Sequence, residues 1–265
     1  MDYLAALKFP FSQPHWKKTL LCSAVCFLIP IVGPIVVLGY LCYVSGAMIR
    51  SRQPTLAPAP TPDPSGAIAY QTPRDNEFPP FDFNRFGDYI AHGIWPFLVS
   101  LVITIPFLVI FYLIFFTVFF SGAFIQNKAI VISVVLIGAL AWFLFVLIVP
   151  LFSTPIFLRA KLMQSFKKAF KMSFIIDFSK RVGLLMILNQ FFLTVIGIPL
   201  MLFGYLTCGI GFYPAMALLM FINTAILVQT YFVYLSRGGE PTPMDASLFS
   251  STTPAAAPSI LLPPA

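Results

Sequence analysis

The polar side chains inside the long apolar stretches of this chain are neutral, so their chemistry is hydrogen bonding rather than proton or charge transfer. The amides that lie deepest in these stretches are Asn189, Gln190, Asn223 and Gln229. Hydrogen bonds between such groups on neighbouring helices stabilise a membrane protein by about 0.6–2 kcal/mol each. We interpret these amides as interhelical contacts, and keep the lining of a path for a neutral solute as the alternative.

Cofactor-binding and catalytic residues are the next candidates. His92 precedes an apolar stretch and is a weak candidate for a cofactor-binding residue, but no second axial ligand accompanies it. Cys22 and Cys26 are four residues apart, a helical spacing rather than the C-x-x-C spacing of a metal or redox site. The sequence has no P-loop, G-x-S-x-G or H-E-x-x-H motif. We therefore expect no cofactor, no metal site, no catalytic residues and no enzymatic activity.

The composition places the chain in a membrane. Hydrophobic residues make up 59% of its 265 residues and charged residues 9%, against roughly 25% charged residues in soluble domains. So few charged side chains cannot cover the surface of a water-soluble domain of this size. The formal net charge is +7, but the basic residues flank apolar stretches, as on the cytoplasmic face of a membrane. We therefore do not expect nucleic acid as a partner.

Four apolar stretches exceed the roughly 20 residues that a helix needs to cross the hydrocarbon of a bilayer. They are residues 94–120, 130–152, 182–206 and 212–235. A tight turn at residues 208–211 separates the last two, so they should form an antiparallel hairpin. We predict an all-α integral membrane fold with four transmembrane helices in two antiparallel hairpins.

A fifth apolar segment, residues 19–48, is interrupted by Pro30, Gly33 and Pro34. It is either one kinked crossing or a broken, re-entrant helix that enters and leaves on the same side. Lysines precede it and arginines follow it, and the positive-inside rule favours the re-entrant form. The same rule places both termini in the cytoplasm, with Lys128 on the outer side of the membrane.

Residues 155–178 have the pattern of an amphipathic helix. Apolar residues recur at every fourth position from Leu158 to Phe174, and lysines recur along another face. This pattern is typical of a helix in the membrane interface with its lysines toward anionic headgroups. The lysines assigned to lipid contact are Lys161, Lys167, Lys168 and Lys171. The alternative is a cytoplasmic helix that packs on the protein's own membrane helices.

Two stretches rich in Pro and Ala cannot propagate a helix or a sheet, and they separate the remaining parts of the chain. We divide the chain into a surface helix and re-entrant hairpin (1–52), a Pro/Ala-rich linker (53–80), an amphipathic helix and first transmembrane hairpin (81–152), a basic interfacial helix (153–181), a second transmembrane hairpin (182–235) and a Pro/Ala-rich tail (236–265).

Several short motifs in the first half resemble a known family. They are Leu7-Lys8-Phe9-Pro10-Phe11, His15-Trp16-Lys17-Lys18, Leu28-Ile29-Pro30-Ile31, Leu38-Gly39-Tyr40, Phe78-Pro79-Pro80-Phe81-Asp82, Phe86-Gly87-Asp88 and Gly93. Over about residues 5–115 the sequence is similar to an uncharacterised prokaryotic integral-membrane family, domain of unknown function 4013. The resemblance implies a membrane architecture and no mechanism. Independently of it, Gly39 and Gly46 should let the second arm of the first hairpin approach a neighbour closely.

These observations favour a structural or accessory subunit of the cytoplasmic membrane. It would bind partner proteins and lipid through its surface helices and extended segments. The expected partners are anionic membrane lipids and either other proteins or further copies of this chain. The alternative function is a transporter or channel component for a neutral or lipid-like solute.

Overall fold

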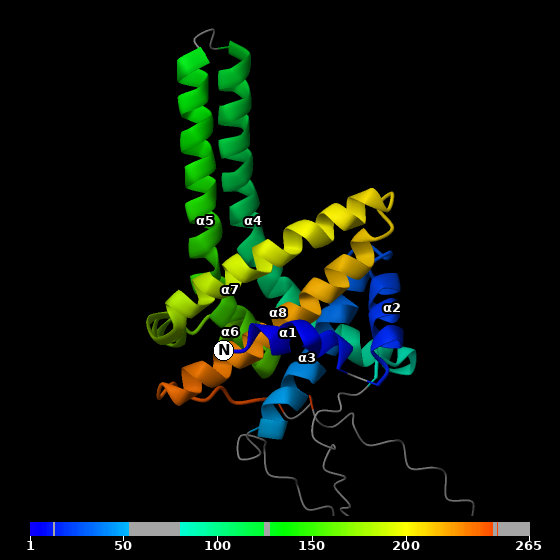
Figure 1. The fold of residues 1–265 in the computed structure, drawn as a ribbon. Helices are drawn as coiled ribbons and strands as arrows, with labels where there is room; N and C mark the ends of the chain where they lie inside the picture. The colour runs from blue at the N-terminus through cyan, green and yellow to red at the C-terminus, as the bar shows by residue number, and fades with distance from the viewer. Residues whose placement is uncertain (13, 53–79, 125–127, 246–247, 249–265) are drawn as a thin grey trace, which may run out of the picture.

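The computed structural model describes the chain except for residues 13, 53–79, 125–127, 246–247 and 249–265. Its described part is helical, without strands (Figure 1). The helices are α1 (Tyr3–Lys8), α2 (Trp16–Cys26), α3 (Val32–Arg52), α4 (Phe86–Phe124), α5 (Lys128–Met163), α6 (Phe166–Ala169), α7 (Met172–Leu206) and α8 (Phe212–Ser236), with 3₁₀ turns at Phe9–Phe11 and Phe83–Arg85.

Five of the described helices are long and apolar enough to cross a membrane: α3, α4, α5, α7 and α8. The prediction of an all-α, multi-pass membrane protein is therefore confirmed. The fifth such helix, α3, comes from the segment predicted to be re-entrant, so the predicted number of four crossings stays a prediction. Length and composition alone do not say which of these helices cross.

The predicted break in the first apolar segment divides it into α2 and α3. The chain turns over residues 27–31, where Pro30 has no amide proton to donate and Ile31 adopts a left-handed conformation with φ of 68°. Gly33 then packs directly on the end of α2. A Cβ there would lie 2.6 Å from the carbonyl carbon of Cys26, so glycine lets α2 and α3 come together.

We call the described part of the protein other than the outer part of the α4–α5 hairpin the body. Helix α3 lies at the centre of the body and crosses α4 at very short distance. A Cβ on Gly39 would overlap the carbonyl oxygen of Tyr89, and a Cβ on Gly93 would overlap that of Ile35. This confirms the close approach predicted at Gly39. An aromatic layer forms beside the crossing, with the ring of Tyr40 5.3 Å from Phe81 and 5.7 Å from Tyr89.

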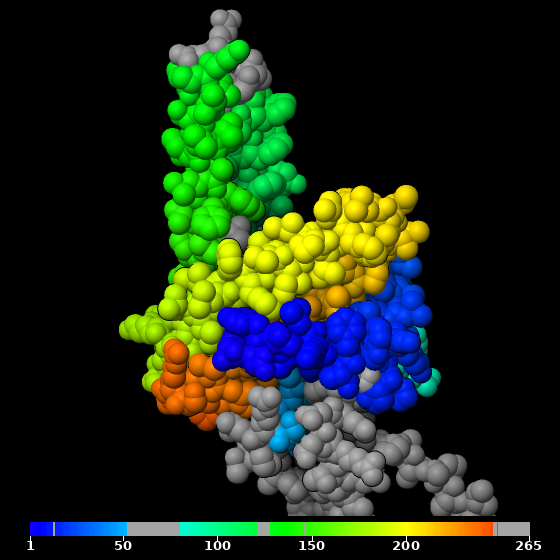
Figure 2. Space-filling model, in the orientation of Figure 1, coloured from blue at the N-terminus to red at the C-terminus, as the bar shows by residue number. Residues whose placement is uncertain are grey.

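Beyond its base, the α4–α5 hairpin stands away from the rest of the protein (Figures 1 and 2). We call residues 104–120 of α4 together with residues 128–149 of α5 the arm. Its helices pack mainly on each other, as in the pairs Phe107–Phe145 at 4.9 Å and Phe111–Trp142 at 4.8 Å. Most of its other described apolar side chains are exposed. Such a surface is stable only in contact with lipid or another apolar surface.

The single amphipathic helix predicted over residues 155–178 is wrong. α5 continues to Met163, Gln164 adopts φ of 47°, the four-residue α6 follows, and α7 begins at Met172. The apolar stripe packs inside the protein, because Leu158 and Phe174 belong to one buried cluster. The alternative of packing on the protein's own helices therefore describes this stripe better.

The first residues after α8 also belong to the folded body, rather than to an extended tail that starts at residue 236. The amides of Glu240 and Thr242 donate to the hydroxyls of Tyr234 (3.0 Å) and Tyr231 (2.8 Å). The amide of Asp245 donates to the carbonyl of Leu162 at 2.8 Å. Main-chain donors hold this segment, so residue composition alone did not reveal it.

Candidate functional site

The most unusual side chain in the body is Lys161, near the end of α5. It is 1% exposed, and its ammonium donates to Thr224 Oγ1 of α8 at 3.1 Å. The same ammonium lies 4.9 Å from the centre of the Phe157 ring, and Cys42 of α3 lies beside it. Lys161 is therefore held where α3, α5 and α8 meet, and its assignment as a lipid contact is wrong.

No carboxylate among the described residues forms an ion pair with Lys161. A buried ammonium without an anion is expensive, since desolvation costs several kcal/mol per ion. Gln164 adds a second uncompensated group. Its Nε2 donates to the carbonyl of Lys161 at 2.7 Å, while its Oε1 is buried without a hydrogen-bond partner. Ionisable groups buried in membrane helices are functional candidates by default, so Lys161 is the strongest candidate that the sequence interpretation missed.

A detectable signal for Lys161 did exist in the sequence. It lies between Leu158 and Leu162, in continuation of the apolar stretch that precedes Pro155. If the helix continues past Pro155, Lys161 therefore lies on the same side of it as the buried apolar residues. Periodicity does not say whether such a face meets lipid or protein.

The other three lysines assigned to lipid differ from Lys161. Lys167, Lys168 and Lys171 are exposed on the short connection between α5 and α7. Lys171 lies 3.5 Å from the carboxylate of Glu240, and the carbonyl of Lys168 accepts from Arg159 at 3.0 Å. Their side chains are therefore exposed at this surface, and their contact with anionic headgroups stays a prediction.

The amides predicted at depth divide between two roles in the structure. Asn189 Nδ2 donates to Thr230 Oγ1 at 2.8 Å and links α7 to α8, while Asn189 Oδ1 accepts from the Tyr3 hydroxyl at 3.0 Å. Burial raises the pKa of Tyr3, so its hydroxyl stays protonated and donates. Gln229 makes two 3.2 Å hydrogen bonds with the backbone of Asp2. These contacts fasten α1 to the α7–α8 hairpin.

Three of the four amides meet at a small cavity of about 30 Å³ between α5, α7 and α8. The polar residues around it are Thr154, Asn189, Gln190, Asn223 and Thr230. A polar cavity of this size holds about one water molecule. Gln229 does not line it, so the predicted set of amides does not form one site.

His92 is used in packing between α3 and α4. Its Nδ1 lies 2.9 Å from the Tyr43 hydroxyl and 2.7 Å from the carbonyl oxygen of Asp88. The guanidinium of Arg85 lies 4.9 Å from the centre of the Tyr43 ring. Within the described residues, no group of three or more His, Cys, Asp or Glu side chains is placed to hold a metal ion.

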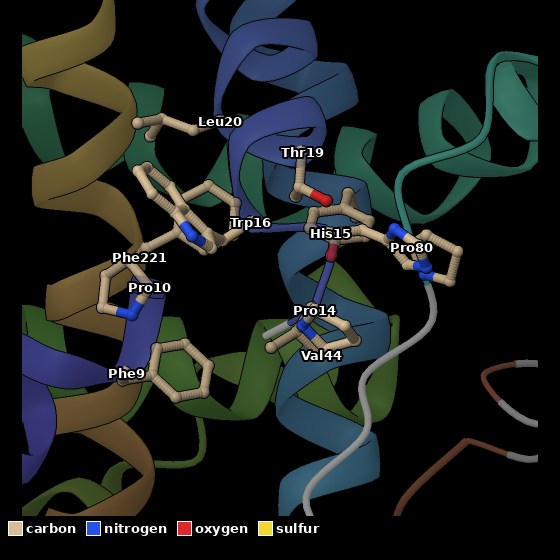
Figure 3. A pocket seen from close by; sticks show the side chains of 11 residues that line it. Phe9, Pro10, Pro14, His15, Trp16, Thr19, Leu20, Val44, Pro80 and Phe221 are labelled. Atoms are coloured by element: carbon tan, nitrogen blue, oxygen red, sulfur yellow. The ribbon is translucent and has the colours of Figure 1, made fainter. Parts of the chain in front are cut away.

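A second pocket, mainly apolar, opens beside α2 (Figure 3). Phe9, Pro10 and Phe221 lie on one side of it, and His15 and Pro80 on the other. It brings the N-terminal segment together with α8 and with the chain that enters α4. Such a lining accepts an apolar group rather than a charged one.

Comparison with known families matches residues 22–209 to the family described as protein of unknown function DUF4013. The match begins within α2 and ends in the turn after α7, so it covers most of the chain and extends past the similarity noted over residues 5–115. No curated protein matches the chain, and no solved structure does. The predicted resemblance is confirmed: the chain belongs to the DUF4013 family of proteins of unknown function.

Proposed function

We propose that this chain is a non-enzymatic structural or accessory subunit of a prokaryotic cytoplasmic membrane, with both termini in the cytoplasm. The observation that carries the proposal is the arm. It exposes apolar and aromatic side chains around both of its helices. They include most of two rows of aromatic rings on α4, in which Phe111 is half-buried. The rows are Phe111–Phe115–Phe119 and Tyr112–Phe116–Phe120, with neighbouring rings 6.0–6.3 Å apart.

Rigid aromatic rows of this kind suit contact with another membrane helix, because large rings gain contact area with little loss of side-chain entropy. The distribution of charge supports the orientation. Lys128 stands at the end of the arm, whereas the other described basic residues lie on the body, among them the exposed Lys167, Lys168 and Lys171. Under the positive-inside rule the body faces the cytoplasm, where these lysines meet anionic lipid.

The proposal predicts that the purified protein is larger than one chain and that the arm touches the partner. A photo-reactive phenylalanine analogue at Phe119 or Leu136, both exposed on the arm, should give protein cross-links in native membranes. The same analogue at Phe203, equally exposed but on α7, is the matched control and should not give the same product. A monodisperse monomer in mild detergent, with lipid cross-links only, would contradict the proposal.

The small polar cavity supports a second candidate, a component that passes a neutral solute. Under this function, proteoliposomes should swell in glycerol, and Asn223→Leu should abolish the swelling because its amide lines the cavity. Gln229→Leu is the control, since that amide binds the backbone of Asp2 and does not line the cavity. Equal swelling with both variants would exclude this function.

A further inference from the structure

Two turns of the body are apolar and exposed. We call residues 27–31 the α2–α3 tip and residues 207–211 the α7–α8 tip. Ile31 is 67% exposed in the first tip, and Leu206 and Ile210, beside and within the second, are 75% and 76% exposed. Adjacent exposed apolar side chains of this size are typical of a surface that contacts a membrane or another protein.

The two tips lie at the same end of the body. α2 packs against α8, and Leu20 of α2 lines the same pocket as Phe221 of α8. From Leu20, α2 continues toward its C-terminal end at Cys26. From Phe221, the chain of α8 followed backward leads in the same direction to its N-terminal end at Phe212. The tips therefore lie near each other, as Figure 1 shows for the dark blue and the yellow-orange turns.

The α7–α8 tip lies far below the end of the arm. Asn223 lines the same cavity as Pro150 of α5. The 11 residues from Phe212 to Asn223 rise about 16 Å, whereas the 22 residues from Lys128 to Pro150 rise about 33 Å. The hydrogen bond between Lys161 and Thr224 also places the tip below the end of the arm, because Lys128 is 33 residues (about 50 Å of helix) from Lys161 and Phe212 is 12 residues (about 18 Å) from Thr224. Figures 1 and 2 show the arm extending well past both tips.

The part of the arm beyond the tips must itself lie in hydrocarbon. Exposed Phe116, Phe120, Ile132 and Leu136 lie along it, and Lys128 is the first charged residue after Asp88. If the α7–α8 tip stood at the far membrane surface, this apolar part of the arm would stand in water. The tip therefore lies short of the far surface, and its exposed Leu206 and Ile210 favour acyl chains over water on the near side.

The backbone of the α7–α8 tip suits an apolar setting. Each amide proton from Thr207 to Phe212 is donated within the hairpin: five go to backbone carbonyls and that of Gly211 goes to Thr207 Oγ1 at 2.9 Å. In the α2–α3 tip the amides of Leu28 and Ile29 likewise bond back to α2. A turn in water does not need such internal pairing, but a turn in hydrocarbon does.

We infer that the α2–α3 and α7–α8 tips together form a wedge that inserts into the acyl chains of the cytoplasmic leaflet and returns, while only the arm crosses the membrane. The absence of Asp, Glu, Lys and Arg from residues 19–49 and 182–236 fits this placement. The inference rests on the membrane orientation given under the proposed function. It keeps the predicted re-entrant first segment and replaces the predicted crossing of the last two apolar stretches.

Cysteine accessibility tests the wedge. Cys208 is exposed in the α7–α8 tip, whereas Cys26 and Cys42 are buried and Cys22 is half-buried. In right-side-out cells and in inside-out vesicles, a membrane-impermeant maleimide should not label Cys208, although it should do so after the membrane is dissolved. Comparison of the wild type with Cys208→Ser isolates this signal without changing the other cysteines.

Matched positions in Cys208→Ser protein complete the experiment. Lys128→Cys should label only from outside, Ser236→Cys only from the cytoplasmic side, and Leu28→Cys from neither side. A nitroxide on Cys208 should relax with oxygen rather than with a water-soluble nickel complex. Labelling of Cys208 from outside, with the other sites as expected, overturns the wedge alone. Labelling of Lys128→Cys from the cytoplasmic side overturns the orientation in the proposed function.

Discussion

Gly39→Ala should destabilise the protein by about 3 kcal/mol or more, in the range seen for severe core defects. The new methyl group would overlap the carbonyl oxygen of Tyr89 and lie 2.6 Å from its carbonyl carbon. Both atoms belong to the backbone of α4, so no side-chain rotation relieves the overlap. The helices must separate, and the aromatic layer of Tyr40, Phe81 and Tyr89 loses contact.

The measurement is thermal unfolding of the purified protein in detergent, together with the yield of folded protein in the membrane. Gly87→Ala is the control, because a Cβ there meets nothing within 4 Å and alanine favours the helix. Gly93→Ala should resemble Gly39→Ala, since its Cβ would overlap the carbonyl of Ile35. Equal unfolding temperatures for Gly39→Ala and Gly87→Ala would show that the crossing is not tight.

The parts of this fold that could be predicted depend on local properties of the chain. Few charges and long apolar stretches indicate membrane helices wherever they pack. Pro30 ends a helix by removing an amide proton and by steric conflict, and Gly39 permits close approach because it has no side chain. These effects need no knowledge of the neighbours, so the membrane class, the first break and a close approach at Gly39 follow from the sequence. That the neighbour is α4 does not.

The parts that could not be predicted depend on which surface a helix meets. The stripe from Leu158 to Phe174 and the lysines beside it fit a membrane interface and a protein interior equally well. The pattern therefore predicts lipid contact for Lys161, although its side chain is buried against Thr224. The level of the α7–α8 tip is set by register against α5, which apolar sequence does not encode.

The candidate site likewise contains residues that local sequence predicts and a contact that it does not predict. The amides at residues 189, 190 and 223 were identified by polarity alone, and they do meet at one cavity. The role of Gln229 depends on the N-terminus of the chain, more than 200 positions away. A contact of that range leaves no local pattern.

Lys161→Met should stabilise the protein. Apolar replacement of buried charged groups has stabilised other proteins by about 1–4 kcal/mol, and we expect a gain within that range. Methionine has a similar length and removes the cost of burying an ammonium, while Thr224 can turn its hydroxyl to its own helix. The free energy of unfolding in mixed micelles measures the effect. Lys168→Met, at an exposed position, should change it little.

The direction of the change separates two roles for Lys161. If Lys161→Met is less stable than the wild type while Lys168→Met is not, the contacts of the ammonium with Thr224 and Phe157 outweigh the cost of its burial. If it is more stable, the lysine is kept at a cost in stability. Loss of the Phe119 cross-link or of the glycerol swelling in that stabilised variant would then assign Lys161 a role in assembly or passage, and retention of both would exclude such a role.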